Sequence, residues 1–436
     1  MAKWQCIYLF FKNLLLLTTV LNEYKITKLP NGTRIISEFI PYVKSFSLGF
    51  WFNVGTRDEN ASNNGISHFI EHMLFKGTKR RSARRISEEI ESYGGYLNAF
   101  TSKEHTCYYT KGLSENLAKS FTILADMIQN PLFKESHVRR ESGVIIDELH
   151  DVNDNPEELI FDIFEEVIFK GNRLSMPVIG TEGNISKFKA DELHKFHRKK
   201  YDSGNLLIVV SGSVENDELV KLAEKHIGGK TSRAKVRRDK FIHRKANDLI
   251  LEKDFHQVHS IIGRATVGFN SKKRTIIKVL STLLGEGSSS RLFLAVREKL
   301  GITYQITSFL NSYQDVSSFG IYYSTNSKQA ERVMDIVLRE LKKLRENKVT
   351  EKELNKVKAY IKGGTLLGLE NTSNRMIRIA NSMLYFNKII TIEDYLKSID
   401  AVTAEDLIKT ANEIFNEEKL IKVILKSNDS KMPAVA

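Results

Sequence analysis

The stretch His68-Phe69-Ile70-Glu71-His72 has the residue types and the spacing of a metal site. It reads H-x-x-E-H, and the preceding Asn63-Asn64-Gly65 provides turn-forming residues before a helix. On a helix, His68 and His72 lie one turn apart, with Cβ atoms about 5–6 Å from each other. Both imidazoles can then reach one ion at zinc–nitrogen distances of about 2.0–2.1 Å. Glu71 borders the same face without having to bind the ion, which is where a general base for a metal-bound water belongs.

A second segment with a helical pattern offers a third ligand. The residues from Arg139 to Glu148 (RRESGVIIDE) place Glu141 and Glu148 on one helical face. We predict that Glu148 is the anionic ligand and that Glu141 is an acceptor that orients a histidine or the base. Three protein ligands leave one tetrahedral position for water, an arrangement typical of catalytic zinc. With only two cysteines in the chain, any metal must be held by histidines and carboxylates.

The composition is that of a globular protein with a substantial core. The chain has 436 residues, of which 41% are hydrophobic and 27% charged, so two or three domains are expected. Its net charge of +13 would attract nucleic acid, anionic lipid or acidic peptide, and charge alone does not choose between them. The basic segment from Lys230 to Lys245 has no helical or alternating apolar pattern, so we interpret it as a solvated linker and expect no nucleic-acid partner.

Residues 4–21 (WQCIYLFFKNLLLLTTVL) form an apolar run nearly as long as a membrane span. Lys12 and Asn13 interrupt this run, and no small-x-small cleavage site follows before Tyr24. Two interpretations stay open: a signal anchor, or a leader that results from assigning too early a start codon. Membrane association is expected only if residues 1–21 are a real anchor. The predicted location is otherwise the cytoplasm, because two cysteines fit a reducing compartment.

The chain shows one order of elements twice, which predicts an internal repeat. The first half reads as strands up to Val54, helices, alternating residues 96–110 and a helix over 114–129, with a closing strand at 205–214. The second half reads as a strand over 259–269, helices over 272–300, strands over 303–323 and a helix over 327–345. We therefore predict an α+β fold of two homologous domains, each an antiparallel sheet backed by helices. The expected parts are an uncertain apolar leader (1–21), a zinc-bearing catalytic domain (22–227), a basic linker (228–245) and a metal-free homologous domain (246–436).

The H-x-x-E-H motif with a distal glutamate resembles that of the inverzincins. The surrounding sequence is similar to that of the pitrilysin/insulinase family of zinc peptidases, in particular its short processing-peptidase branch. The resemblance extends from about Tyr24 to Phe415 and is carried by LPNGTR (29–34), GISHFIEHMLFKGT (65–78), LNAFT (97–101) and SSRLF (289–293). It implies a peptidase with one zinc ion per chain.

The resemblance also assigns roles residue by residue. It implies that His68, His72 and Glu148 bind zinc and that Glu71 activates water. Asn98, Ala99 and Phe100 match the family's edge strand, to which an extended substrate adds as a further strand. Arg297 and Tyr304 match a pair that holds substrate and polarises the scissile carbonyl. One departure is the stretch before Pro177, residues 172–176, which lacks the family's His-Pro-x-Gly.

These observations predict a zinc endopeptidase that acts on peptides or unfolded segments. The alternative is a catalytically silent subunit that binds peptides or scaffolds a peptidase pair. Longer family members enclose substrate between two halves, and this chain corresponds to one half. We therefore expect a dimer, most simply a homodimer, or else a heterodimer with a homologous subunit.

Overall fold

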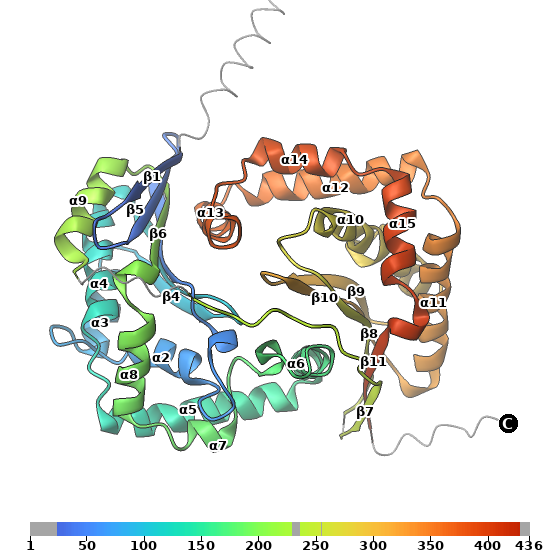
Figure 1. The fold of residues 1–436 in the computed structure, drawn as a ribbon, viewed down its shortest axis with the longest axis horizontal. Helices are drawn as coiled ribbons and strands as arrows, with labels where there is room; N and C mark the ends of the chain where they lie inside the picture. Colours follow the sequence, from blue (N-terminus) through green and yellow to red (C-terminus); the bar gives the residue numbers. More distant parts are fainter. Residues whose placement is uncertain (1–23, 229–235, 254, 428–436) are drawn as a thin grey trace, which may run out of the picture.

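Two sheets, each covered by helices, build the molecule (Figure 1). The structure is a computed structural model and describes residues 24–228, 236–253 and 255–427. The apolar leader 1–21 and part of the predicted linker fall outside these ranges. Among the helices of the described residues, none is both long and apolar enough to cross a membrane. The predicted α+β class is confirmed.

The first sheet has six strands in the order β1-β2-β6-β3-β5-β4. Its strands are β1 (Tyr24–Lys28), β2 (Arg34–Phe39), β3 (Ser45–Phe52), β4 (Tyr96–Thr101), β5 (Thr106–Leu113) and β6 (Leu206–Gly212). All neighbouring pairs are antiparallel except β2 and β6, which are parallel. The strand expected to close the sheet, β6, lies inside it between β2 and β3. Its uninterrupted apolar run suits a strand that is covered on both faces.

The second sheet repeats this topology, with the order β7-β11-β8-β10-β9 matching β2-β6-β3-β5-β4. Its strands are β7 (Leu249–Glu252), β8 (Val258–Val267), β9 (Gln305–Ser312), β10 (Val316–Thr325) and β11 (Ile421–Lys426). The pair β7 and β11 is parallel, as is its counterpart β2 and β6. The predicted internal repeat is therefore present. The prediction that both sheets are antiparallel holds except for one parallel pair in each sheet.

Helices cover both sheets and follow the same order in each half. In the first half they are α2 (Ile66–Leu74), α3 (Ala83–Glu91), α4 (Leu117–Gln129), α5 (Glu135–Asp154), α7 (Glu182–Ile185), α8 (Ala190–Lys200) and α9 (Asn216–His226). In the second half they are α10 (Lys273–Gly285), α11 (Ala330–Glu346), α12 (Glu351–Gly368), α14 (Ile392–Asp400) and α15 (Ala404–Ile414). The helix expected over 272–300 is divided: α10 ends before Gly287, whose φ is +84°, and a π-helical turn follows at Phe293–Glu298.

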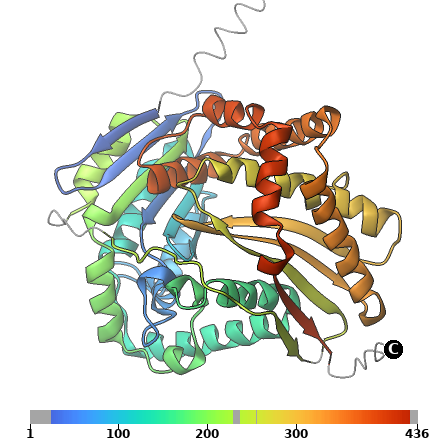
Figure 2. The same cartoon turned by 45° about the vertical axis from the view of Figure 1, so that its right-hand side comes forward.

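Each half lends one helix to the sheet of the other half. Helix α6 (Pro156–Ile168), which follows α5, packs against β8 and β11, where Ile160 and Phe164 are fully buried. Helix α13 (Thr372–Phe386) packs against β3 and β6, where Met376 and Ile379 are buried. Figures 1 and 2 show α6 under the second sheet and α13 beside the first. This exchange joins the two halves through two apolar cores.

A buried cluster of charges also joins the halves, at the turn that connects β4 to β5. Arg57 is only 2% exposed, and its guanidinium lies 2.7 Å from Glu104 Oε1 in that turn and 2.6 Å from Asp315 Oδ1 between β9 and β10. Arg238 binds Asp58 at 2.7 Å and donates to the Glu104 carbonyl at 2.7 Å. Buried ions need partners of this kind, because an unpaired buried charge is strongly destabilising.

We predict that Arg57→Met lowers the free energy of unfolding by about 3–5 kcal/mol, because it leaves buried carboxylates without their main cation. The measurement is chemical denaturation followed by circular dichroism. The matched control is Arg84→Met, which removes the exposed ion pair of Arg84 with Glu88 (2.5 Å) and should cost less than about 1 kcal/mol. Equal losses for the two variants would contradict the buried cluster's role.

Candidate metal centre

The start of helix α2 is fixed by a buried carboxylate. Glu59 accepts hydrogen bonds from the backbone N–H groups of Gly65 (2.8 Å) and Ser67 (2.8 Å). These are N–H groups of the first turn, which have no partner within the helix. Gly65 has a φ of +99°, and a Cβ there would lie 2.9 Å from the Cα of Gly180. The register of His68, Glu71 and His72 is therefore set by Glu59 and by a glycine that no larger residue can replace without strain.

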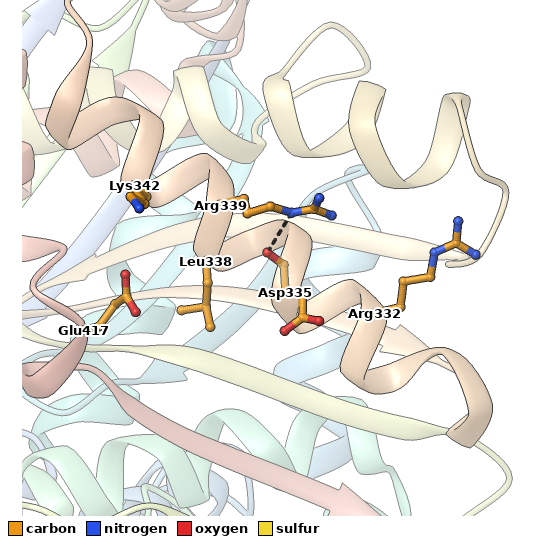
Figure 3. A pocket seen from close by; sticks show the side chains of 6 residues that line it. All are labelled: Arg332, Asp335, Leu338, Arg339, Lys342 and Glu417. Carbon is orange, nitrogen blue, oxygen red and sulfur yellow. Dashed lines mark hydrogen bonds between the residues drawn. The ribbon is translucent and has the colours of Figure 1, made fainter. Parts of the chain in front are cut away.

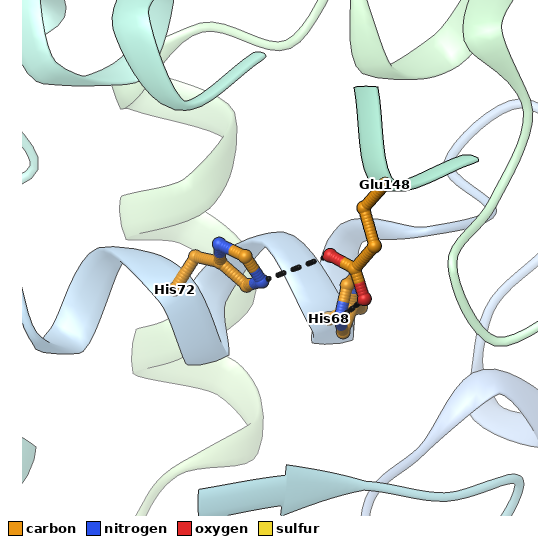
Figure 4. Close-up of side chains that lie close together, drawn as sticks. All are labelled: His68, His72 and Glu148. Atoms are coloured by element: carbon orange, nitrogen blue, oxygen red, sulfur yellow. Dashed lines mark ion pairs between the residues drawn. The ribbon is translucent and has the colours of Figure 1, made fainter. Parts of the chain in front are cut away.

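The two histidines of α2 and Glu148 of α5 converge (Figure 4). Glu148 Oε2 lies 3.4 Å from His72 Nε2, and Glu148 Oε1 lies 3.7 Å from His68 Nε2. One ligand atom from each residue can be chosen so that all lie within 4.8 Å of one another, and within the described residues this is the one such group of histidines, cysteines and carboxylates. The structure thus brings the three predicted ligands together, although their sequence positions span 81 residues.

Glu141, the other carboxylate on this face of α5, links the two helices behind the ligands. Its Oε2 lies 3.4 Å from His72 Nδ1, and its Oε1 lies 2.7 Å from Lys76 Nζ. The side chain of Glu141 is buried. Glu141 contacts Nδ1 of the His72 ring while Nε2 faces Glu148, a position that suits the orienting role predicted for Glu141.

Glu71 lies beside the ligands, where strand β4 ends. Its Oε2 accepts a hydrogen bond of 2.5 Å from the Thr101 hydroxyl. Burial raises the pKa of Glu71, and the hydrogen bond from Thr101 opposes this rise. A carboxylate with a raised pKa is suited to accept a proton near neutral pH.

The charges of the three ligands depend on one another. Burial, with the neighbouring His72, lowers the pKa of His68 to about 4, so this imidazole is neutral at pH 7. Burial also acts to lower the pKa of His72, but the hydrogen bond and charge of Glu148 prevail and raise it. The same hydrogen bond lowers the pKa of Glu148, whose side chain is 45% exposed. A neutral imidazole and an ionised carboxylate are the forms that bind metal.

The predicted substrate-binding residues lie on the edge of the first sheet. Among the described residues, strand β4 pairs with β5 alone, so its other side is open there. Ser102 N–H donates to the His105 carbonyl at the end of this ladder, and the antiparallel alternation then turns the Ala99 backbone groups towards the open side. The Ala99 N–H accordingly donates to the Asn98 side chain at 2.8 Å. Asn98 and Phe100 point to the opposite face from Thr101.

Arg297 and Tyr304 lie in the second half of the chain, and neither has a contact with the ligand cluster. Tyr304 directly precedes β9 and is 79% exposed. Arg297 is also exposed, and its guanidinium lies 5.0 Å from the centre of the Phe293 ring. The structure of one chain therefore leaves this pair facing solvent.

A surface hollow of about 470 Å³ on α11 offers no comparable chemistry (Figure 3). Its lining mixes charges of both signs, from Arg332, Asp335, Arg339, Lys342 and Glu417, with the apolar Leu338.

Comparison with known proteins points to one family of peptidases. A family profile described as insulinase (peptidase family M16) matches residues 34–182, and one described as the peptidase M16 inactive domain matches residues 187–361. An uncharacterized zinc protease of Rickettsia felis is 35% identical over 397 residues, which cover 90% of this chain and 95% of the relative. The chain belongs to the insulinase family of peptidases, family M16.

Other relatives and solved structures support this membership. An uncharacterized zinc protease of Bacillus subtilis is 33% identical over 399 residues, covering 92% of this M16 chain and 97% of the relative. The crystal structure of a protease from Helicobacter pylori superposes with a TM-score of 0.87 at 25% identity, covering 93% of this chain and all of the other. An M16 inactive-domain structure from Pseudomonas fluorescens has a TM-score of 0.86 at 18% identity, which supports the fold alone.

The ligand cluster fits the zinc ion that M16 membership implies. Ligand atoms bound at about 2.0–2.1 Å in a tetrahedron lie about 3.3–3.4 Å apart. The two oxygens of Glu148 lie 3.4 Å from His72 Nε2 and 3.7 Å from His68 Nε2, and one atom from each residue can be chosen within 4.8 Å of the others, so small side-chain shifts would bring the three ligands onto one ion. Two imidazoles and one carboxylate form a donor set typical of catalytic zinc.

Several supporting residues were not predicted from the sequence. Lys76 stands four residues after His72, but α2 ends at Leu74, so helical spacing offered only a weak signal for its ion pair with Glu141. Thr101 shares the α2-facing side of β4 with Ala99, but its partner Glu71 could not be inferred from strand alternation. The loop 172–176 that departs from the family pattern also has a role: the carbonyls of Leu174 and Met176 accept hydrogen bonds from Lys103.

We predict that Glu148→Gln weakens zinc binding at least tenfold, because a neutral amide replaces the only anionic ligand. The measurement is zinc content after dialysis against a competing chelator. Asp147→Asn, which changes an exposed neighbour on the same helix, is the control and should keep the wild-type zinc content. Full zinc occupancy in the Glu148→Gln variant would remove Glu148 from the site.

Proposed function

We propose that this M16 chain is a zinc endopeptidase that hydrolyses peptides or unfolded segments. The observation that carries the proposal is the convergence of His68, His72 and Glu148 with Glu71 beside them at the open edge of a sheet. Relatives named zinc proteases that match over 90% or more of this chain support it. One zinc ion per chain is expected.

The substrate would bind as an additional strand on β4. An extended peptide satisfies the backbone groups of an open edge, and affinity then comes mostly from the main chain. The Ala99 N–H would exchange the Asn98 side chain for a substrate carbonyl. Folded proteins are poor substrates under this proposal, because their strands are already paired within their own sheets.

Glu71 would act as general base and then as general acid. His68, His72 and Glu148 would hold the zinc ion, which would lower the pKa of a bound water towards neutrality and polarise a carbonyl. Because Oε2 of Glu71 accepts the hydrogen bond from Thr101, Oε1 is the oxygen that takes the proton of the attacking water. Glu71 then gives this proton to the departing amine.

We further propose that two chains complete each site. Tyr304 and Arg297 are exposed in the single chain, and the Arg297 guanidinium contacts only its helix neighbour Phe293 among the contacts found in the described residues, although the family pattern gives the pair substrate contacts. In a dimer, most simply a homodimer, the pair from one protomer would reach the zinc site of the other. Tyr304 would stabilise the oxyanion, and Arg297 would hold the substrate.

We predict that Glu71→Gln keeps one zinc per chain and loses hydrolysis by at least 100-fold, because Glu71 moves protons and does not bind the metal. The measurement pairs zinc content with the cleavage rate of a mixed peptide pool, resolved by mass spectrometry. Loss of zinc together with activity would make Glu71 a ligand. A wild-type chain that binds zinc and peptide but cleaves none, alone or with a homologous partner, would favour the catalytically silent subunit.

We predict that an inactive Glu71→Gln chain and an inactive Tyr304→Phe chain regain part of the wild-type activity when they are assembled together. Mixed dimers hold one site with both Glu71 and Tyr304 intact if the site is shared. The measurement is the peptidase rate after unfolding and joint refolding, with differently tagged chains to isolate mixed dimers. Each variant refolded alone is the control. No recovery in isolated mixed dimers, or a fully active monomer in sedimentation, would contradict the shared site.

A further inference from the structure

We propose that Thr101 is a positioning residue for the Glu71 carboxylate. The proposal rests on the function proposed above, because it concerns the residue that would act as the base. Its structural basis is the hydrogen bond of 2.5 Å from Thr101 Oγ1 to Glu71 Oε2, which joins the last residue of β4 to the middle of α2. A hydrogen bond from a hydroxyl to a carboxylate is stronger than one between neutral groups when the carboxylate is ionised, which is the form in which Glu71 would act as a base.

The side chain of Thr101 has little freedom to leave this position. Along β4, Leu97, Ala99 and Thr101 share the face that packs towards α2. Leu97 and Ala99 contact the hydrophobic core of the first half of the chain. Thr101 is β-branched, so few χ1 rotamers are open to it. Glu71 itself is largely enclosed, so a rotation of its carboxylate away from Thr101 would leave buried polar atoms without partners.

The turn that follows Thr101 is fixed at each of its residues. Ser102 N–H donates to the His105 carbonyl at 2.8 Å, and Lys103 donates to two carbonyls of the loop 172–176. Glu104 binds Arg57 at 2.7 Å and accepts from the Gln314 N–H at 2.9 Å.

His105 completes the turn, with its ring centre 4.8 Å from that of Tyr385 on α13. Gln314 and Tyr385 belong to the second half of the chain, so the metal-free half holds the turn and, through it, Thr101. The second half of the chain would therefore support the zinc site by holding this turn, without supplying a metal ligand.

The arrangement couples the substrate strand to the base. Strand β4 is the edge to which an extended peptide would add, and the same strand carries the hydroxyl that aims Glu71. With Oε2 held by Thr101, Oε1 would be left to accept the proton of a metal-bound water, which is the pre-organisation that general-base catalysis requires. Without Thr101, the carboxylate would sample other orientations and fewer bound substrates would meet a correctly aimed base.

The first test compares Thr101→Val with Thr101→Ser. Valine keeps the β-branched shape and removes the hydroxyl, whereas serine keeps the hydroxyl. We expect Thr101→Val to lower kcat at least tenfold, with KM within about twofold and one zinc per chain. Thr101→Ser should restore kcat to within about threefold of the wild type. A Thr101→Val enzyme with wild-type kcat, or a serine variant as slow as the valine variant, would overturn the proposal.

Thr110→Val is the matched control. Thr110 is fully buried in the adjacent strand β5, and its hydroxyl has no hydrogen-bond partner within the part of the chain that the structure describes. The same substitution there should leave kcat, KM and zinc content unchanged. A kcat as low as that of Thr101→Val would show that the loss reflects a disturbed sheet and would overturn the specific role of Thr101.

A second test needs no peptidase activity. In metal-free protein, Thr101→Val should lower the urea midpoint of unfolding when Glu71 is present, and by less than half as much in the Glu71→Ala background, because the hydroxyl then has no carboxylate to bind. Equal shifts in both backgrounds would overturn the proposal. Absence of cleavage by the zinc-loaded wild type would instead contradict the proposed function, and the unfolding measurement would still decide whether Thr101 holds Glu71.

Discussion

The packing of α2 against α5 is the contact on which the candidate metal centre depends, because its predicted ligands come from two helices that are far apart in the sequence. Two histidines one turn apart can supply two ligands to one ion. The third ligand must come from another element, and here Glu148 of α5 places its carboxylate oxygens within about 4 Å of both Nε2 atoms. Glu141 fixes this contact by binding both His72 and Lys76 of the α2 region. The ligand geometry therefore follows from the relative position of two helices.

The same contact concentrates negative charge. Glu71, Glu141 and Glu148 approach one pair of imidazoles, and their mutual repulsion must be balanced. Lys76 neutralises Glu141, and the raised pKa of His72 shows that these carboxylates favour a proton on that ring. A divalent cation between His68, His72 and Glu148 would balance the same charge, so metal binding would stabilise this part of the fold.

The second half of the chain supports the site without repeating its chemistry. Its sheet has the topology of the first, yet among the described residues the histidine and carboxylate cluster occurs only in the first half. The exchanged helices α6 and α13 and the ions around Arg57 hold the two halves together. The turn after β4 lies in that interface, so the duplicated half acts as a frame for the strand that carries Thr101.

Sequence patterns predicted the parts of the site that depend on local periodicity. The spacing of His68 and His72 on one helix, the place of Glu148 on another and the repeat of strands and helices were all accessible from the chain. The interior position of β6 was not, because an apolar run does not reveal its neighbours in a sheet. The contacts of Thr101 with Glu71 and of Glu59 with the start of α2 also escaped prediction, since they join segments whose approach only the fold determines.

X-ray diffraction at the zinc absorption edge, from crystals of the wild-type protein, would test the account most directly. The account predicts one anomalous peak per chain, within about 2.0–2.2 Å of a nitrogen of His68, a nitrogen of His72 and an oxygen of Glu148. Glu71 should remain outside this distance, with its Oε2 still bound to the Thr101 hydroxyl. A peak elsewhere in the chain, or a zinc ion that takes Glu71 in place of Glu148, would contradict it.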